Sequence, residues 1–455
     1  MKYTGINIGP IVDTLSLARK PKELWAASYM FSYLMERIVK AVKDKGLRIV
    51  SPVEAGDNDR SVGLYPDRAY VGNKDNVDIS EAISEAVREF EEATGVSEDY
   101  VNVMSADVEA ASDADAIKKL NDIFARAELA NRPVDDEGRE KVRDLITKKD
   151  VNQVLGGKCN ISTIEEIATR AKNEGNYSYW DYICIVQADG DNMGKTIEGS
   201  GNKLGELSAA LSNQGKEAKD TITGYGGTPI YIGGDDLLFL APVVSRNGKS
   251  NIFDLLKKLN TMFHDKMQEY SNSPISMSFG LSITYHKYPL YEALKAAREL
   301  LYEAKKEKYK DVEVKNAIAW CLRKHSGSGF SGFISQNEAL KEVSDKFYEL
   351  FGKKSEEKVV SAIAHKLREN MSLVEIIRKS GQENWGQRLE AFYTTMLNEG
   401  DASNKAYTKS TRELLGTLFK AYPDDNEKEI SEILETMYGM LRTAKFINGE
   451  EERDE

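Results

Sequence analysis

Two adjacent acidic residues, Asp235 and Asp236, follow two glycines inside the apolar run YIGGDDLLFL at residues 231–240. Gly233 and Gly234 suit a tight hairpin turn, because glycine tolerates positive φ and a turn led by glycine matches the twist of antiparallel strands. Taken alone, the segment can be read as a polar turn or as a functional site. A site would require charged groups from neighbouring elements.

A second acidic segment ends another strand-like run, YICIVQAD, whose last residue is Asp189. In a ferredoxin-like sheet the first strand lies beside the hairpin, so we expect the carboxylates of Asp189 and Asp235 to converge. Such a cluster repels itself and raises its own pKa values unless a cation is present. Carboxylate oxygens suit Mg²⁺ or Mn²⁺, which bind one or two carboxylates together with substrate phosphates.

Two further features point to phosphate groups. Gly190 interrupts the strand and a helix is expected to begin near Asn192, where free backbone N–H groups can receive an anion. The helical pattern LYEALKAARELLYEAKKEK places Arg298 and Lys305 on one face. A solvated basic face is the alternative reading of that helix. Beside the acidic cluster the two cations form a candidate phosphate clamp, and the predicted chemistry is metal-dependent nucleotidyl transfer.

Strand and helix patterns predict an α+β fold class with two similar α+β blocks, each containing a ferredoxin-like sheet. A helical connector separates the blocks, and a helical bundle follows the second one. The expected domains are residues 1–130, 131–178, 179–325 and 326–455.

The two α+β blocks look like copies of one unit. When Asn7 is aligned with Asp189, the segment IVSPVE falls within one residue of YIGGDD. Val53 and Glu54 then occupy the positions of Asp235 and Asp236. The first copy is therefore predicted to be degenerate and to carry no chemistry at Val53 and Glu54.

Composition narrows the class of protein further. The net charge of −12 argues against a protein that coats nucleic acid with a general basic surface. No apolar run approaches the roughly 18 residues that would cross a membrane, and the N-terminus does not read as a secretory signal. We therefore expect a cytoplasmic location and no membrane partner. The three scattered cysteines, Cys159, Cys184 and Cys321, support neither disulfides nor a zinc site.

Taken together, these motifs resemble the large polymerase/cyclase subunit of type III, Cmr-type CRISPR effector complexes. The matching segments are INIGP (6–10), KELWAASYMFSYL (22–34), QADGDNMGK (187–195), YIGGDD (231–236) and LLYEAK (300–305). GGDEF diguanylate cyclases share the same palm core. The resemblance implies two tandem palm domains, the second one active, between helical connector and C-terminal domains.

The resemblance also implies an enzyme that works with other Cmr-type subunits, a guide RNA and a target RNA. Pairing of the guide with foreign RNA would switch on the conversion of ATP into a signalling nucleotide. Carried over to this chain, Asp189 and Asp235 would be metal ligands, and Asp236 would lie at the metal or at the attacking hydroxyl. The remaining nucleotide-binding candidates are Gly190, Asp191, Asn192, Gly233, Gly234, Arg298 and Lys305, with Lys305 on the phosphates.

The chain departs from the family pattern in two ways. It starts directly at the first palm strand, without the N-terminal HD nuclease domain of many members, and it lacks their cysteine-rich zinc motif. The single His-Asp pair, His264-Asp265, reads as a helix surface. Some relatives without the nuclease domain resemble enzymes that transfer AMP to S-adenosylmethionine, so the product is either a cyclic oligoadenylate or that conjugate.

Two other functions stay open from the sequence. The chain could be a catalytically idle scaffold that binds ATP or RNA and organises partner subunits, although the intact acidic residues of the second block count against it. It could also be a stand-alone diguanylate cyclase, which GGDD in place of GGDEF disfavours.

Overall fold

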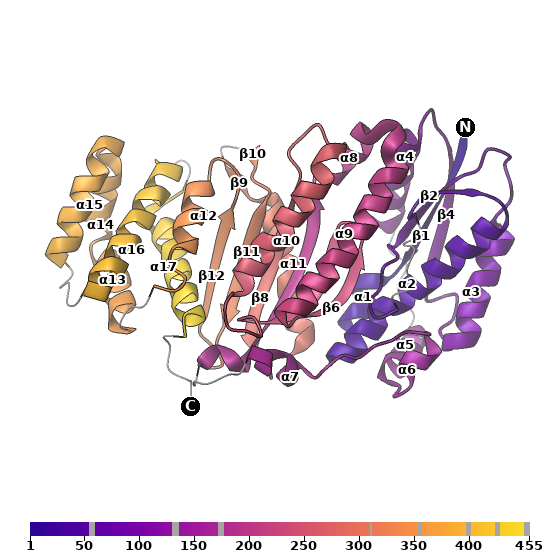
Figure 1. Cartoon of the computed structure of the whole chain (residues 1–455), viewed down its shortest axis with the longest axis horizontal. Helices are drawn as coiled ribbons and strands as arrows, with labels where there is room; N and C mark the ends of the chain where they lie inside the picture. The colour runs from indigo at the N-terminus through magenta and orange to yellow at the C-terminus, as the bar shows by residue number, and fades with distance from the viewer. Residues whose placement is uncertain are drawn as a thin grey trace.

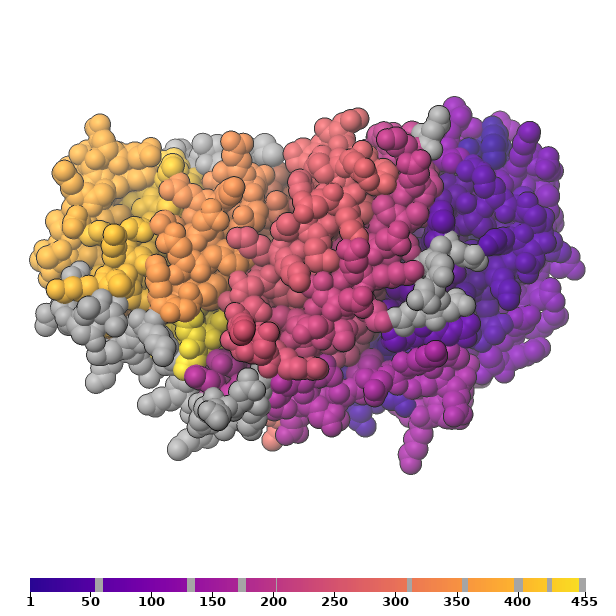
Figure 2. Space-filling view, viewed as in Figure 1, coloured from indigo at the N-terminus to yellow at the C-terminus, as the bar shows by residue number. Residues whose placement is uncertain are grey.

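The computed structural model describes residues 1–53, 60–129, 136–171, 177–309, 312–353, 357–396, 402–423 and 428–449. A four-stranded sheet, a six-stranded sheet and a group of C-terminal helices follow one another along the long axis of the molecule (Figure 1). The space-filling view shows these parts in the same order, from the indigo N-terminal end to the gold and yellow C-terminal helices (Figure 2). The α+β fold class predicted from the sequence is confirmed.

The first sheet has the strand order β2-β3-β1-β4, and its pairs are all antiparallel. Its elements in chain order are β1 (Lys2–Gly9), α1 (Ile11–Ser16), α2 (Pro21–Asp44), β2 (Arg48–Ser51), β3 (Arg68–Gly72), α3 (Ser80–Thr94), β4 (Asn102–Glu109) and α4 (Asp113–Leu129). Proline at the first position of α2 starts that helix with its φ already set. Most of α2 is then buried against α3, a connector helix and the second sheet.

The second sheet repeats this order in its core as β6-β7-β5-β8 and extends it by two strands, β11 and β12. The strands are β5 (Tyr182–Asp191), β6 (Thr228–Gly233), β7 (Asp236–Pro242), β8 (Ser276–Tyr285), β11 (Ala317–Arg323) and β12 (Gly329–Ser335). The identical order of four antiparallel strands supports the predicted duplication.

Helices cover both faces of the second sheet. They are α8 (Met193–Ser200), α9 (Leu204–Tyr225), α10 (Ile252–Met267) and α11 (Leu290–Lys306). Alternate residues of β8 enter different layers: Phe279, Leu281 and Ile283 join the core with α10, while Gly280 faces α11. The helix that carries Lys305 therefore approaches the sheet from the face opposite to α10.

The connector consists of α5 (Asp136–Thr147), α6 (Val151–Val154) and α7 (Ile164–Ala168), and a short two-stranded ribbon, β9 (Lys308–Tyr309) with β10 (Val312–Glu313), precedes β11. The C-terminal helices are α12 (Lys341–Tyr348), α13 (Glu357–Glu369), α14 (Met371–Lys379), α15 (Gln382–Met396), α16 (Ala402–Ala421) and α17 (Ile430–Ile447). Within the described ranges, we find no helix with the length and apolarity that a bilayer span demands.

One expected domain boundary, between residues 325 and 326, falls within the hairpin of β11 and β12. Residues from 326 onward were predicted to belong to the helical bundle, but β12 pairs with β11 along its whole length. The segment GFSGFIS contains two glycines and two serines among its apolar residues, so its strand pattern is hard to recognise from the sequence. The hairpin of β11 and β12 belongs to the second sheet.

Contact between α11 and β8 is unusually close at Gly280. A Cβ atom at this position would lie 2.0 Å from the carbonyl oxygen of Ala297 and 2.3 Å from the backbone nitrogen of Leu301. Only a residue without a side chain allows the helix backbone to rest on the strand here. This contact sets the height of α11 above the sheet.

We predict that Gly280→Ala destabilises the protein by roughly 2 kcal/mol or more, because the added methyl group must push α11 away from β8. Gly224→Ala in α9 is the matched control, since its methyl group would meet nothing within 4 Å and alanine favours a helix over glycine. Thermal unfolding of the two variants checks this. Equal melting temperatures would contradict it.

Candidate active site

The acidic hairpin has the predicted geometry. Gly233 pairs with Asp236 across β6 and β7, which leaves Gly234 and Asp235 as the two-residue turn. Gly234 has a φ of 64°, a left-handed conformation that favours glycine. On the neighbouring strand, Ala188 pairs with Leu237, so Asp189 lies next to the start of β7.

Asp235 and β5 are in direct contact at Gly190. A Cβ atom on Gly190 would lie 2.8 Å from Cβ of Asp235 and 2.9 Å from its Oδ2. The glycine after Asp189 therefore makes room for the Asp235 side chain over the end of β5. The two carboxylates that the sequence predicted to converge are brought together.

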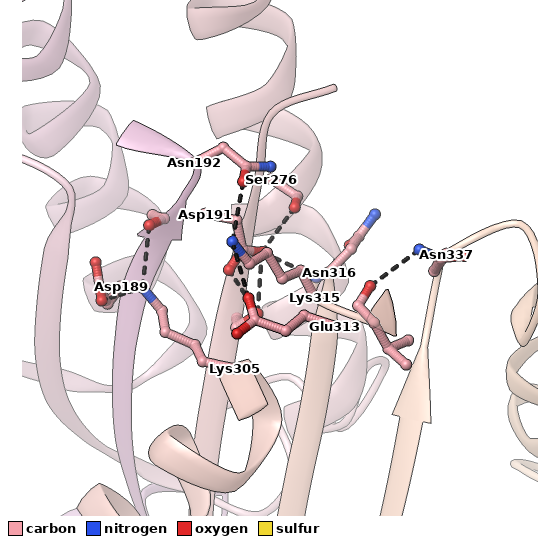
Figure 3. Close-up of polar contacts among 12 residues, drawn as sticks. Asp189, Asp191, Asn192, Ser276, Lys305, Glu313, Lys315, Asn316 and Asn337 are labelled. Atoms are coloured by element: carbon pink, nitrogen blue, oxygen red, sulfur yellow. Dashed lines mark hydrogen bonds and ion pairs between the residues drawn. The ribbon is translucent and has the colours of Figure 1, made fainter. Parts of the chain in front are cut away.

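Lys305 completes this cluster from α11. Its ammonium group forms an ion pair with Asp189 and donates a hydrogen bond to the carbonyl oxygen of Gly190 at 3.1 Å. Figure 3 shows Lys305 and Asp189 joined at the end of β5. The predicted phosphate-binding lysine thus lies at the acidic cluster in the described structure.

Crowding of like charges changes the chemistry of the aspartates. Burial, followed by repulsion from Asp189, raises the pKa of Asp235 to about 7. Loss of hydration also raises the pKa of Asp236, although this residue keeps an exposed surface, and neighbouring carboxylates, among them Asp67 of the first sheet, raise it further. The single charge of Lys305 does not neutralise the three carboxylates of Asp189, Asp235 and Asp236. The cluster therefore favours the binding of an additional cation.

Two carboxylates of the cluster, those of Asp189 and Asp235, could bind magnesium or manganese. Asp189 and Asp235 offer carboxylate oxygens close together, and Mg²⁺ commonly uses one or two carboxylates together with substrate phosphates. Among the residues that the structure describes, no three His, Cys, Asp or Glu side chains are placed to hold one ion. Asp236 is therefore not assembled with the other two as a third ligand in this arrangement.

Asp191 serves a different purpose from the one predicted. Its buried carboxylate accepts hydrogen bonds from the hydroxyl groups of Ser276 and Ser278 and from the backbone N–H of Asn316, at 2.7–2.9 Å. These partners engage both carboxylate oxygens and tie the end of β5 to β8 and to Asn316, which directly precedes β11.

Asn192 and Arg298 are placed differently. Asn192 has a φ of 61° and precedes α8, as the expected helix start requires, and its side chain donates to Pro274 and accepts from Lys315. Arg298 is exposed on α11, two turns or about 10 Å along the helix from Lys305. The structure does not bring Arg298 to the acidic cluster.

The first copy differs from the second in a way that the sequence alignment misplaced. In the first copy, Asn7 on β1 lies opposite Arg68 on β3, and in the second copy, Asp189 on β5 lies opposite Asp236 on β7. Arg68 therefore corresponds to Asp236, and Asp67 corresponds to Asp235. The alignment of Val53 and Glu54 with them was wrong because the chain between β2 and β3 is longer than the turn between β6 and β7. Glu54 lies outside the described residues.

The charges around the first site are also inverted. Helix α4 follows the fourth strand of the repeat, as α11 does, and both contain 17 residues, so Glu128 corresponds to Lys305. Glu128 accepts hydrogen bonds from Asn7 at 3.2 Å and from Arg68 at 2.7 Å. Arg68 and Glu128 thus stand where Asp236 and Lys305 stand in the second copy, and Asn7 replaces Asp189, while Asp67 keeps the charge of Asp235. The pair of carboxylates formed by Asp189 and Asp235 therefore has no equivalent at these positions of the first copy.

A small cleft of about 90 Å³ opens beside the acidic turn, between the two copies. It is lined by Gly234 of the turn, by Tyr29 and Glu36 of α2, and by Ser208 of α9, among others. Sequence reasoning missed the cleft, because its walls come from elements far apart in the chain.

Two sequence families match this chain. The second palm domain of Cas10/Cmr2 matches residues 182–319, and the N-terminal region of the CRISPR-associated protein Cmr2 matches residues 3–91. Over these two regions the chain is therefore similar to Cas10/Cmr2 proteins. The first match covers the whole acidic cluster, including Lys305, and the second covers the first sheet as far as α3.

Individual relatives agree with this assignment. The Cmr subunit Cmr2 of Pyrococcus furiosus is 31% identical over 183 residues, which cover 34% of this chain and 20% of that relative. A type III-B Cmr-beta structure in the apo state matches with a TM-score of 0.57 and 11% identity, over 89% of this chain and 78% of the other. A Csm1-Csm4 cassette in complex with cA4 gives a TM-score of 0.52 and 11% identity, over 96% and 70%. These structures share the fold.

We predict that Asp235→Asn raises the melting temperature at pH 8 by roughly 3 °C or more. Because the pKa of Asp235 is raised in the folded state to about 7, folding favours the protonated form, and the wild type loses stability as the pH rises from about 4 to 7. The gain of the variant should therefore vanish near pH 4. A gain that is equal at pH 4.5 and pH 8 would contradict this account.

Proposed function

We propose that the chain is a metal-dependent nucleotidyltransferase that uses ATP and releases pyrophosphate. The observation that carries this proposal is the convergence of Asp189, Asp235 and Lys305 at the end of β5. Two carboxylates that repel each other provide a place for a divalent cation, and a lysine beside them provides a contact for phosphate groups.

In this proposal each group positions a part of the substrate. Asp189 and Asp235 would hold Mg²⁺ or Mn²⁺, which supplies charge neutralisation and activation of the attacking hydroxyl group when bound. Lys305 would move from Asp189 to the phosphates once the carboxylates are neutralised by the cation. Helix α8 begins directly after Asn192, so its first backbone N–H groups would offer further contacts for phosphate oxygens.

The relatives support ATP as the substrate and a complex as the setting. Structures that share this fold include Csm1-Csm4 cassettes with cA4 and with pppApA, and a Cmr-beta complex bound to cognate target RNA. We infer that this chain likewise works with other Cmr-type subunits, a guide RNA and a target RNA. Its match spans one fifth of the curated relative, so these partners belong to the proposal.

The acceptor of the adenylyl group would lie in the cleft between the two copies. Gly234, next to Asp235, forms part of its wall, so a ligand there would lie within reach of the reacting phosphate. The cleft contains two tyrosines, Tyr29 and Tyr65, for stacking with a base. Either a second ATP, leading to a cyclic oligoadenylate, or S-adenosylmethionine, leading to an AMP conjugate, is proposed as the acceptor.

The assembled complex with target RNA, labelled ATP and Mg²⁺ or Mn²⁺ tests this function. Parallel reactions with and without S-adenosylmethionine identify the product. The wild type should form one of the two nucleotides, and Asp235→Ala should abolish it. ATP binding without turnover would contradict the proposal and favour an idle scaffold.

We predict that Lys305→Ala lowers kcat/KM for ATP by about tenfold or more, which is the usual range for one charge-assisted hydrogen bond. Lys306→Ala is the matched control, because Lys306 is exposed on the same turn of α11 and its ammonium lies 5.6 Å from the ring of Tyr302. Both variants should keep the wild-type melting temperature to within a few degrees. Unchanged ATP kinetics in Lys305→Ala would remove this residue from the site.

A further inference from the structure

Lys315 and Asn316 adopt a rare backbone conformation close to the acidic cluster. Both residues, in the connection between β10 and β11, have left-handed φ values, 44° for Lys315 and 49° for Asn316. Lysine has no local side-chain interaction that favours this region, in contrast to asparagine. Two successive residues of this kind persist only where the surrounding structure holds them.

Several hydrogen bonds hold this pair in place. The hydroxyl of Ser335 on β12 donates to the carbonyl oxygens of Lys315 at 2.7 Å and Asn316 at 3.1 Å. The backbone N–H of Asn316 donates to the carboxylate of Asp191 at 2.9 Å. The side-chain oxygen of Asn316 accepts a hydrogen bond from the side chain of Asn260 on α10 at 2.6 Å. The position of Lys315 is therefore fixed by β5, α10 and β12 together.

This backbone arrangement places the ammonium group of Lys315 beside Asn192. Its Nζ donates to Oδ1 of Asn192 at 3.0 Å, and Lys305 donates to the carbonyl oxygen of Gly190. Two positive charges that follow the segment 190–192 by more than 100 residues in the chain thus contact it. Figure 3 shows both side chains pointing toward this segment, Lys305 from α11 and Lys315 from the connection before β11.

Lys315 is available to a ligand. Its side chain is 30% exposed, and its ion pair with Glu313 is long, at 3.4 Å, with a partner that is 41% exposed. Such a pair is weak in water and can be exchanged for a phosphate oxygen. Its other partner, Asn192, directly precedes the free N–H groups of α8.

We propose that Lys315 contacts the polyphosphate of the nucleotide and forms, with Lys305, a two-lysine clamp around the segment 190–192. This inference rests on the proposed function, because it assigns a second phosphate contact to the same site. It also gives Asp191 a clear task. By binding Asn316, Asp191 positions the left-handed pair and thereby directs Lys315 toward the start of α8.

The backbone conformation allows a clean test. Lys315→Asn removes the positive charge but keeps a residue that tolerates positive φ. Lys315→Gly removes the charge together with the whole side chain. Lys315→Arg keeps the charge. Lys287→Ala is the control, since Lys287 is exposed beyond the other end of β8. Equilibrium binding of ATP and AMP in the presence of Mg²⁺ is measured for the full chain in its complex.

We expect Lys315→Asn and Lys315→Gly to weaken ATP binding about tenfold and AMP binding less than threefold, while Lys315→Arg stays within about threefold of wild type for both ligands. ATP affinity should also depend less steeply on salt concentration in the two uncharged variants. Lys287→Ala should bind as the wild type does.

Wild-type affinity for ATP in Lys315→Asn would overturn the inference and leave the proposed function intact. Equal weakening of ATP and AMP, with a lower melting temperature, would assign Lys315 a purely structural role and also overturn it. A wild-type complex that does not bind ATP would contradict both the inference and the proposed function.

Discussion

The contact between Asp235 and Gly190 is the constraint on which the candidate site depends. Because Gly190 has no side chain, the carboxyl group of Asp235 can lie over the end of β5, next to Asp189. That contact places the hairpin of β6 and β7 against β5, where burial of Asp235 and then repulsion from Asp189 raise the pKa of Asp235 to about 7. The protein thus retains a locally unfavourable arrangement of charge, which is common where a cation or substrate must be bound. The remaining elements either support this arrangement or offset its charge.

Support comes from α11 and from the strands beside β5. Helix α11 rests on β8 at Gly280, and this contact allows Lys305 to reach Asp189. Farther along β5, Asp191 ties the strand end to β8 and to Asn316 through three different donors. The first copy has the same strand order, but Arg68 and Glu128 exchange the signs of the charges. In the first copy Arg68 and Glu128 pair with each other, whereas the second copy brings Asp235 and Asp189 together with a single lysine. The same strand order thus carries opposite patterns of charge in its two halves.

Local chemistry made part of this site predictable from the sequence. Gly234 has a left-handed conformation, the strand before Asp189 is apolar except for Gln187, and a helix follows Asn192, so the turn, the strand and the helix start could all be recognised. Long-range geometry was less accessible. The long connection between β2 and β3 shifted the sequence alignment of the two copies. Helical spacing alone could not show that Arg298 is exposed to solvent. The hydroxyl groups that bind Asp191 belong to residues that follow it by more than 80 positions in the chain. Lys315 gave no sequence signal, because left-handed lysine is set by tertiary contacts.

The account depends on Asp235 losing its proton when a cation arrives. The most direct test is the pH dependence of binding of a non-hydrolysable ATP analogue with Mg²⁺, compared between wild type and Asp235→Asn. Protonation of the analogue itself is common to both proteins, so it cancels in the comparison. Below pH 7, the account predicts that the affinity of the wild type for the analogue rises more steeply with pH than the affinity of Asp235→Asn, by up to about tenfold per pH unit. Above pH 7, the two affinities should change with pH in the same way. Parallel pH profiles for the two proteins would contradict it.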